Sequence, residues 1–138
     1  MTKNNDKPLH RIMYVEDDPD LQDIVSLGLK LGGNFTVKVC SSGQQALEEI
    51  VAFQPDLVIL DVVMPEMSGP KTLVELRKIP EAADIPMVFM TSKIQPAQLT
   101  LYRNLGAIGV IKKPLNPMKL TAQVRAIWEN HLKETDQT

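Results

Sequence analysis

The stretch Pro55-Asp56-Leu57-Val58-Ile59-Leu60-Asp61 decides the fold class of this 138-residue chain. Its centre, Leu57-Val58-Ile59-Leu60, is apolar without a break and lacks the alternation of a half-exposed strand. Such a short run between turn-forming residues is typical of a strand that is covered on both faces. We therefore expect this segment to lie inside a parallel sheet with helices on either side.

Further short apolar runs occur on both sides of this stretch, so that the predicted strands are 12–15, 35–40, 57–60, 87–90 and 108–111. Helical patterns follow them, beginning after the capping residues Asp18 and Ser42 for the first two helices. Apolar residues at helical spacing mark the other three helices, namely Leu73, Leu76 and Ile79, then Ala97, Leu101 and Leu105, then Leu120, Val124 and Ile127.

A strand–helix order repeated five times predicts an α/β protein with a doubly wound, five-stranded parallel sheet and helices on both faces. Five such units suggest the flavodoxin-like strand order 2-1-3-4-5, although the pattern alone does not fix it. We expect one domain over residues 10–132, with polar tails at 1–9 and 133–138.

The composition excludes several classes of protein. Fifteen basic and seventeen acidic residues give a net charge of -2, so no direct contact with nucleic acid is expected. The single cysteine, Cys40, cannot form an internal disulfide and is expected to be a small buried residue of the second strand. There is no signal-peptide pattern and no apolar stretch of the roughly 20 residues that cross a bilayer, so we expect a cytoplasmic protein without membrane contact.

Four of the five predicted strands end in charged or hydroxyl residues. These strand ends are Glu16-Asp17, Asp61, Thr91-Ser92 and Lys112-Lys113. In an open parallel sheet, binding sites form beyond the carboxyl ends of the strands, so we expect these side chains to meet.

Three neighbouring carboxylates raise one another's pKa unless a cation offsets their charge. Oxygen ligands without histidine or cysteine suit a hard ion such as Mg²⁺. Lys113 and Thr91 add a positive charge and a hydroxyl donor. Because phosphoryl transfer needs mainly positioning and charge stabilisation, the sequence predicts a site for this chemistry with a carboxylate as the nucleophile.

Four motifs resemble those of the receiver domain of two-component response regulators (CheY-like), in that family's order and spacing. They are Val15-Glu16-Asp17-Asp18, then 55–61 continuing through Met64-Pro65 to Gly69, then Thr91-Ser92, then Lys113-Pro114. The resemblance covers roughly residues 10–132.

The resemblance implies a role for each residue that matches a motif. Asp61 would accept the phosphoryl group and also contact the metal. Asp17 would bind Mg²⁺ directly, Glu16 would act through water, and Val63 would offer its backbone carbonyl.

The remaining family positions concern the switch. Thr91 would turn toward the phosphoryl group, Lys113 would pair with it, and the small Ser92 would leave access open. The bond before Pro114 is usually cis in the family. Val110 is a departure, because many members carry there an aromatic residue that swings inward on activation.

The implied function is a phosphorylation-activated signalling switch. A sensor histidine kinase or a histidine phosphotransfer protein would supply the phosphoryl group, and a downstream protein would bind the face of helix four, strand five and helix five. Such a receiver is not an enzyme in the ordinary sense, although self-phosphorylation with Mg²⁺ and slow self-dephosphorylation are expected. If the chain is complete, it would act as a single-domain regulator or a phosphorelay intermediate.

Three other functions can be considered, and each would require a different pattern of residues in the sequence. A phosphatase of the haloacid dehalogenase type needs a second aspartate where Val63 stands. An interaction platform that is never phosphorylated would be favoured if Asp17, Asp61, Thr91 or Lys113 were missing. A flavodoxin-like nucleotide binder needs a glycine-rich loop after the first strand, where acidic residues stand instead.

Overall fold

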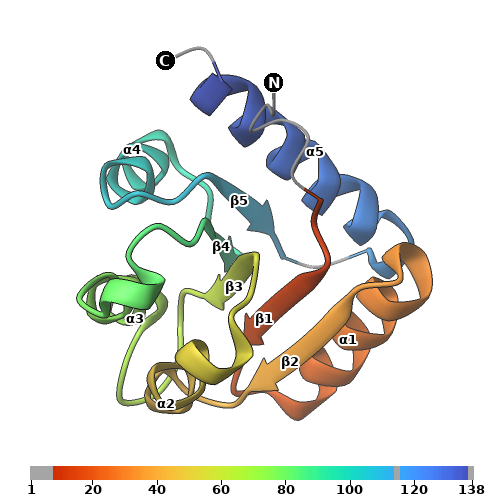
Figure 1. Ribbon diagram of the computed structural model, residues 1–138. Helices are drawn as coiled ribbons and strands as arrows, with labels where there is room; N and C mark the ends of the chain where they lie inside the picture. The colour runs from red at the N-terminus through yellow and green to blue at the C-terminus, as the bar shows by residue number, and fades with distance from the viewer. Residues whose placement is uncertain (1–7, 114–115, 137–138) are drawn as a thin grey trace.

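The computed structural model describes residues 8–113 and 116–136, and its centre is a parallel sheet of five strands (Figure 1). The strands are β1 (Arg11–Val15), β2 (Thr36–Cys40), β3 (Leu57–Asp61), β4 (Met87–Thr91) and β5 (Gly109–Lys112). Their order is β2-β1-β3-β4-β5, and every neighbouring pair is parallel. The predicted flavodoxin-like α/β architecture is therefore confirmed.

Helices cover both faces of the sheet (Figure 1). One face carries α1 (Pro19–Gly33) and α5 (Pro117–Asp136), and the other carries α2 (Gly43–Phe53), α3 (Gly69–Arg77) and α4 (Pro96–Asn104), with a short 3₁₀ turn η2 (Pro80–Ala82) before β4. Each face buries its own apolar cluster. The sheet separates these two apolar cores.

Strand β1 shows why the central strands contain apolar residues at successive positions. Alternate side chains of a strand point to opposite faces. Ile12 and Tyr14 lie in the core beneath α1 and α5, whereas Met13 and Val15 lie in the core beneath α2 and α3. The run 57–60 is fully buried for the same reason, as the sequence predicts.

Side chains cap the first turns of helices, among them α1, α2 and α3. Asp18 accepts hydrogen bonds from the backbone N–H groups of Asp20 and Leu21, and Ser42 does the same for Gln45. Both caps agree with the sequence prediction. Ser68 caps α3 in the same manner, a role that the sequence analysis did not assign.

The third helix is shorter than its apolar spacing indicates. It ends at Arg77, and Ile79 has an extended backbone instead of continuing the helix. Pro80 follows directly, and proline disfavours the helical conformation for the residue before it. Ile79 is nevertheless packed against the core on this side of the sheet.

The buried face of α4 differs from the expected one. Ala97 and Leu101 are exposed, and Tyr102 is buried, with its ring centroid 4.8 Å from that of Phe89 on β4. An aromatic ring buries far more apolar surface than alanine, so packing of Tyr102 sets the rotation of the helix. Tyr102 is thus a core residue.

Both ends of the expected domain carry additional structure. Leu9 is buried in the core beneath α1 and α5, although it falls in the segment expected to be a tail. Helix α5 continues to Asp136, past position 133, where the second tail was expected to start. Within the described part of the chain, no helix has the length and apolar character needed to cross a membrane.

The fold predicts an unreactive thiol at the end of β2. Burial raises the pKa of Cys40 to about 12, with a further contribution from the charge of Glu49. Because the thiolate is the reactive form, we expect Cys40 to react with an aromatic disulfide reagent at pH 8 more than about a hundredfold slower in the folded protein than in urea. Equal rates in the two conditions would contradict the burial of this strand end.

Candidate functional site

The carboxyl edge of the sheet brings together residues from strands that are far apart in sequence. Asp61 is the last residue of β3, Glu16 follows β1, and Lys113 follows β5. Since β1 and β3 pair in register at Val15 and Leu60, the acidic residues emerge beside each other. The convergence predicted from the strand ends is therefore present.

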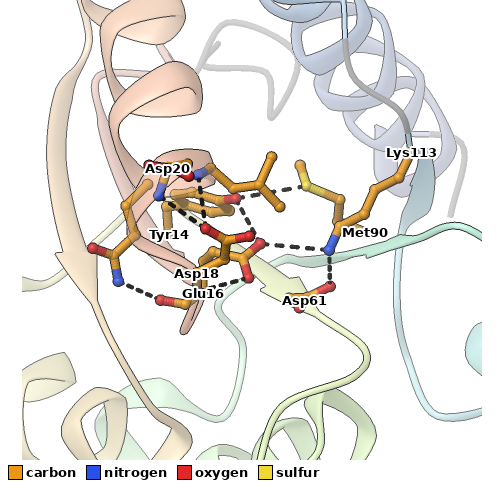
Figure 2. Close-up of polar contacts among 9 residues, drawn as sticks. Tyr14, Glu16, Asp18, Asp20, Asp61, Met90 and Lys113 are labelled. Carbon is orange, nitrogen blue, oxygen red and sulfur yellow. Dashed lines mark hydrogen bonds and ion pairs between the residues drawn. The ribbon is translucent and has the colours of Figure 1, made fainter.

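Lys113 lies between two acidic side chains (Figure 2). Its Nζ atom is 2.6 Å from Oδ1 of Asp61 and 3.6 Å from Oε1 of Glu16. Asp61 and Glu16 are almost completely buried, and the lysine is half-buried. A single ammonium group thus faces two buried carboxylates and can balance the charge of only one of them.

Glu16 is held at several of its atoms. The Tyr14 hydroxyl donates a hydrogen bond of 2.9 Å to Oε1, and the Asp18 backbone N–H donates one of 3.3 Å to Oε2 (Figure 2). The side-chain amide of Gln22 also donates to the backbone carbonyl of Glu16. The position of this carboxylate is therefore set by groups on β1 and α1.

The charges of the site shift the proton affinities of its members. Burial, assisted by the negative charge of Asp61, raises the pKa of Glu16, and its hydrogen bonds only partly oppose this effect. Burial disfavours the charged form of Lys113, but the hydrogen bond and charge of Asp61 outweigh it and raise the lysine pKa. Burial also raises the pKa of Tyr14, so its hydroxyl keeps its proton and remains a donor. The carboxylates thus lie in a site that is short of positive charge.

Three carboxylates have the composition and spacing of a site for a hard cation. Glu16, Asp17 and Asp61 each offer an oxygen, and these oxygens lie within 4.8 Å of one another. Glu16 and Asp61 are buried, whereas Asp17 is exposed at the mouth. All three donors are carboxylate oxygens, which is the ligand type that Mg²⁺ prefers.

A cavity of about 280 Å³ opens over these residues. Besides the carboxylates and Lys113, it is lined by Val63, Thr91 and Ser92. The Thr91 hydroxyl accepts a hydrogen bond of 3.2 Å from the Lys93 backbone N–H, so in this state it is engaged with the loop after β4. Val63 is 77% exposed, and Ser92 is exposed as well.

Two other predicted positions lie away from this cavity or outside the described residues. Val110 is on β5 and lines a separate hollow of about 290 Å³ beside Tyr102 of α4. Pro114, with the expected cis bond before it, lies outside the described residues. Lys112 is exposed and does not line the site, because adjacent residues of a strand point to opposite faces.

No sequence motif assigns a role to Tyr14, although the sequence contains a signal for one. Tyr14 and Glu16 are two residues apart on an extended segment, and the period of a strand places such residues on the same face. Gly69 belonged to a motif, but the reason for glycine there becomes visible only in three dimensions. A Cβ atom at Gly69 would lie 2.3 Å from the backbone carbonyl oxygen of Asp61.

The strand order and the acidic cavity at the carboxyl edge define the class of the protein as a flavodoxin-like α/β domain with a candidate cation site. Residues 12–125 match the family model of the response regulator receiver domain, and the chain therefore belongs to this family. Membership means that the chain is a switch module of two-component systems, whose members bind Mg²⁺ at such an acidic cluster.

Several known proteins are similar to this chain. A probable cyclic di-GMP phosphodiesterase of Vibrio cholerae is 35% identical over 86% of this chain and 26% of its own length. The DNA-binding response regulator MtrA of Mycolicibacterium smegmatis is 34% identical over 84% of this chain and 49% of its own length. The chain thus spans about half or less of the length of these relatives.

Solved structures agree with the fold. The chemotaxis protein CheY4 of Vibrio cholerae superposes with a TM-score of 0.80 at 25% identity, covering 87% of this chain and 99% of that protein. A response regulator from Chloroflexus aurantiacus gives 0.77 at 27% identity, covering 87% and 98%.

The close approach of Gly69 to Asp61 predicts a sensitive position. We expect Gly69→Ala to lower the free energy of unfolding in urea by about 2 kcal/mol, because the added methyl group overlaps the Asp61 carbonyl and forces the loop after β3 to move.

Gly28→Ala is the matched control. The nearest atom to its added Cβ would lie 3.4 Å away, and alanine favours the helical conformation of α1. Equal effects of the two substitutions would show that Gly69 is not required for this approach.

Proposed function

We propose that this receiver switches its binding state when Asp61 accepts a phosphoryl group. The observation that carries the proposal is the placement of Asp61, buried at the end of β3, with Lys113 Nζ 2.6 Å from one of its oxygens and the cavity above it. A buried carboxylate with one cation and an open approach has the features of a nucleophile for phosphoryl transfer.

The metal site proposed here consists of Asp17 and Asp61, with Glu16 acting through water and the backbone carbonyl of Val63 completing the set. The chemistry of the donors supports this assignment, since all are oxygens. When bound, Mg²⁺ would offset the carboxylate charge and the charge of the incoming phosphoryl group.

The proposed donor is a phosphohistidine on a sensor kinase or a phosphotransfer protein. In the transfer, a carboxylate oxygen of Asp61 forms a bond to phosphorus while the phosphorus–nitrogen bond breaks and the imidazole leaves. Lys113 then pairs with the phosphoryl oxygens. Slow hydrolysis of the aspartyl phosphate by water would return the protein to its first state.

The proposed switch starts at Thr91. Its hydroxyl now accepts a hydrogen bond from the Lys93 backbone, and a phosphoryl group in the cavity would offer it a charged acceptor instead. Such an exchange moves the loop that leads from β4 to α4. By resemblance to the receiver family, the proposed output face is formed by α4, β5 and α5, where a downstream protein would bind the changed surface.

A receiver with this site can act on a separate protein, or it can act on further segments to which it is joined. In our proposal this receiver either passes its phosphoryl group on in a phosphorelay or acts by binding a protein target, and it contacts no nucleic acid itself, consistent with its net charge of -2. The relatives named above join a receiver of this kind to other segments, since the chain spans about half or less of their length.

The proposal predicts one phosphoryl adduct that depends on Asp61. After incubation with Mg²⁺ and acetyl phosphate, intact-mass spectrometry should detect a single adduct on the parent protein and none on Asp61→Asn. The adduct should be lost under hydroxylamine treatment, as expected for an acyl phosphate.

Asp84→Asn is the control for a lost negative charge, because Asp84 is exposed and lies before β4, at the opposite edge of the sheet. This variant should be labelled like the parent. Labelling of Asp61→Asn at the parent rate would refute Asp61 as the acceptor.

A second prediction concerns the metal. Asp17→Ala removes one of three carboxylates from the cluster, and we expect Mg²⁺ affinity in calorimetric titration to fall by at least about tenfold. Asp20→Ala, an exposed acid in the first turn of α1, serves as the control. Unchanged affinity in Asp17→Ala would remove Asp17 from the proposed metal site.

A further inference from the structure

Tyr14 has a polar end in an otherwise apolar core. Its side chain is completely buried, and its ring belongs to the apolar cluster beneath α1 and α5. The hydroxyl lies at the border between this core and the carboxyl edge (Figure 2). A buried tyrosine hydroxyl requires a partner, since burial without a hydrogen bond is unfavourable.

The partner of this hydroxyl is the carboxylate of Glu16. The donated hydrogen bond is 2.9 Å long, and both residues have almost no exposed surface. The same hydroxyl lies 3.8 Å from the sulfur of Met90, which is only a weak acceptor. The hydrogen bond to Glu16 is therefore the stronger of these two contacts.

The other contacts of the Glu16 carboxylate are longer. The Asp18 backbone N–H reaches Oε2 at 3.3 Å, and Lys113 Nζ lies 3.6 Å from Oε1. Lys113 is closer to Asp61, at 2.6 Å, and stands on the segment after β5. Tyr14, in contrast, is fixed within a central strand that pairs with β2 and β3.

We propose that Tyr14 is a positioning residue, whose hydroxyl fixes the Glu16 carboxylate at the carboxyl edge for binding of the divalent cation. This inference rests on the proposed function, because it assigns a role within the same metal site. Groups that hydrogen-bond to the residues around a metal orient them, and their loss weakens metal binding. The ring contributes to the core, and the hydroxyl contributes to the site.

Tyr14→Phe separates these two contributions, because it keeps the ring and removes only the hydroxyl. In calorimetric titration we expect about tenfold weaker Mg²⁺ binding than in the parent. Labelling by acetyl phosphate should be slower at low Mg²⁺ and return to the parent rate at saturating Mg²⁺. A residue that served only the core would change thermal stability and leave the Mg²⁺ affinity unchanged.

Tyr102→Phe is the matched control. It removes a hydroxyl from another buried tyrosine, on α4 and on the opposite face of the sheet. Its Mg²⁺ affinity should equal that of the parent. Circular dichroism and thermal unfolding of both variants would show that the fold is retained.

The variant Glu16→Asp provides a second test of the hydrogen bond between Tyr14 and Glu16. Aspartate is one methylene shorter, so its carboxylate withdraws from the Tyr14 hydroxyl, and adding Tyr14→Phe to this variant should weaken Mg²⁺ binding no further.

Parent-like affinity in Tyr14→Phe would overturn the inference, as would an equal loss in the Glu16→Asp background. Absence of Mg²⁺ binding by the parent itself would instead refute the proposed metal site, and the role of Tyr14 with it.

Discussion

The ion pair between Lys113 and Asp61 is the interaction on which the site depends. Two buried carboxylates, Asp61 and Glu16, share a single ammonium group, at 2.6 and 3.6 Å. Removing that cation would leave negative charges uncompensated in a buried environment, which is strongly destabilising. The sheet must therefore bring the segment after β5 to the ends of β1 and β3, and this requirement links the edge strand β5 to the interior strands of the sheet.

The parallel register meets this requirement. Every strand runs in the same direction, so the residues that follow β1, β3 and β5 all emerge at one edge. The backbone after β3 must then turn away without covering Asp61. Gly69 permits this turn, because its backbone lies where any side chain would overlap the Asp61 carbonyl.

Most of this arrangement could be predicted from the sequence. Apolar runs gave the strands, and the residues after them gave Glu16, Asp61 and Lys113, because a parallel sheet sends all strand ends to one edge. The rotation of α4 could not be predicted, since Leu101 and Tyr102 are both apolar and only packing against Phe89 decides which is buried. The hydrogen bond from Tyr14 to Glu16 could not be predicted for a different reason. The apolar ring of Tyr14 is sufficient to explain why this residue lies in the core, so nothing in the sequence required a role for its hydroxyl.

In this site, the carboxylate charges that make folding less favourable are the same charges that would bind a cation. Burial and the charge of Asp61 raise the pKa of Glu16, which means that the ionised form is less favourable in the folded protein than in water. A cation at the three carboxylates would relieve this repulsion, so part of its binding free energy comes from strain already present in the fold. Replacing these acids by neutral residues would remove both the repulsion and the cation site, because the same charges produce both. A hydroxyl that holds Glu16 in place, such as that of Tyr14, keeps the repelling groups in the geometry that a cation requires.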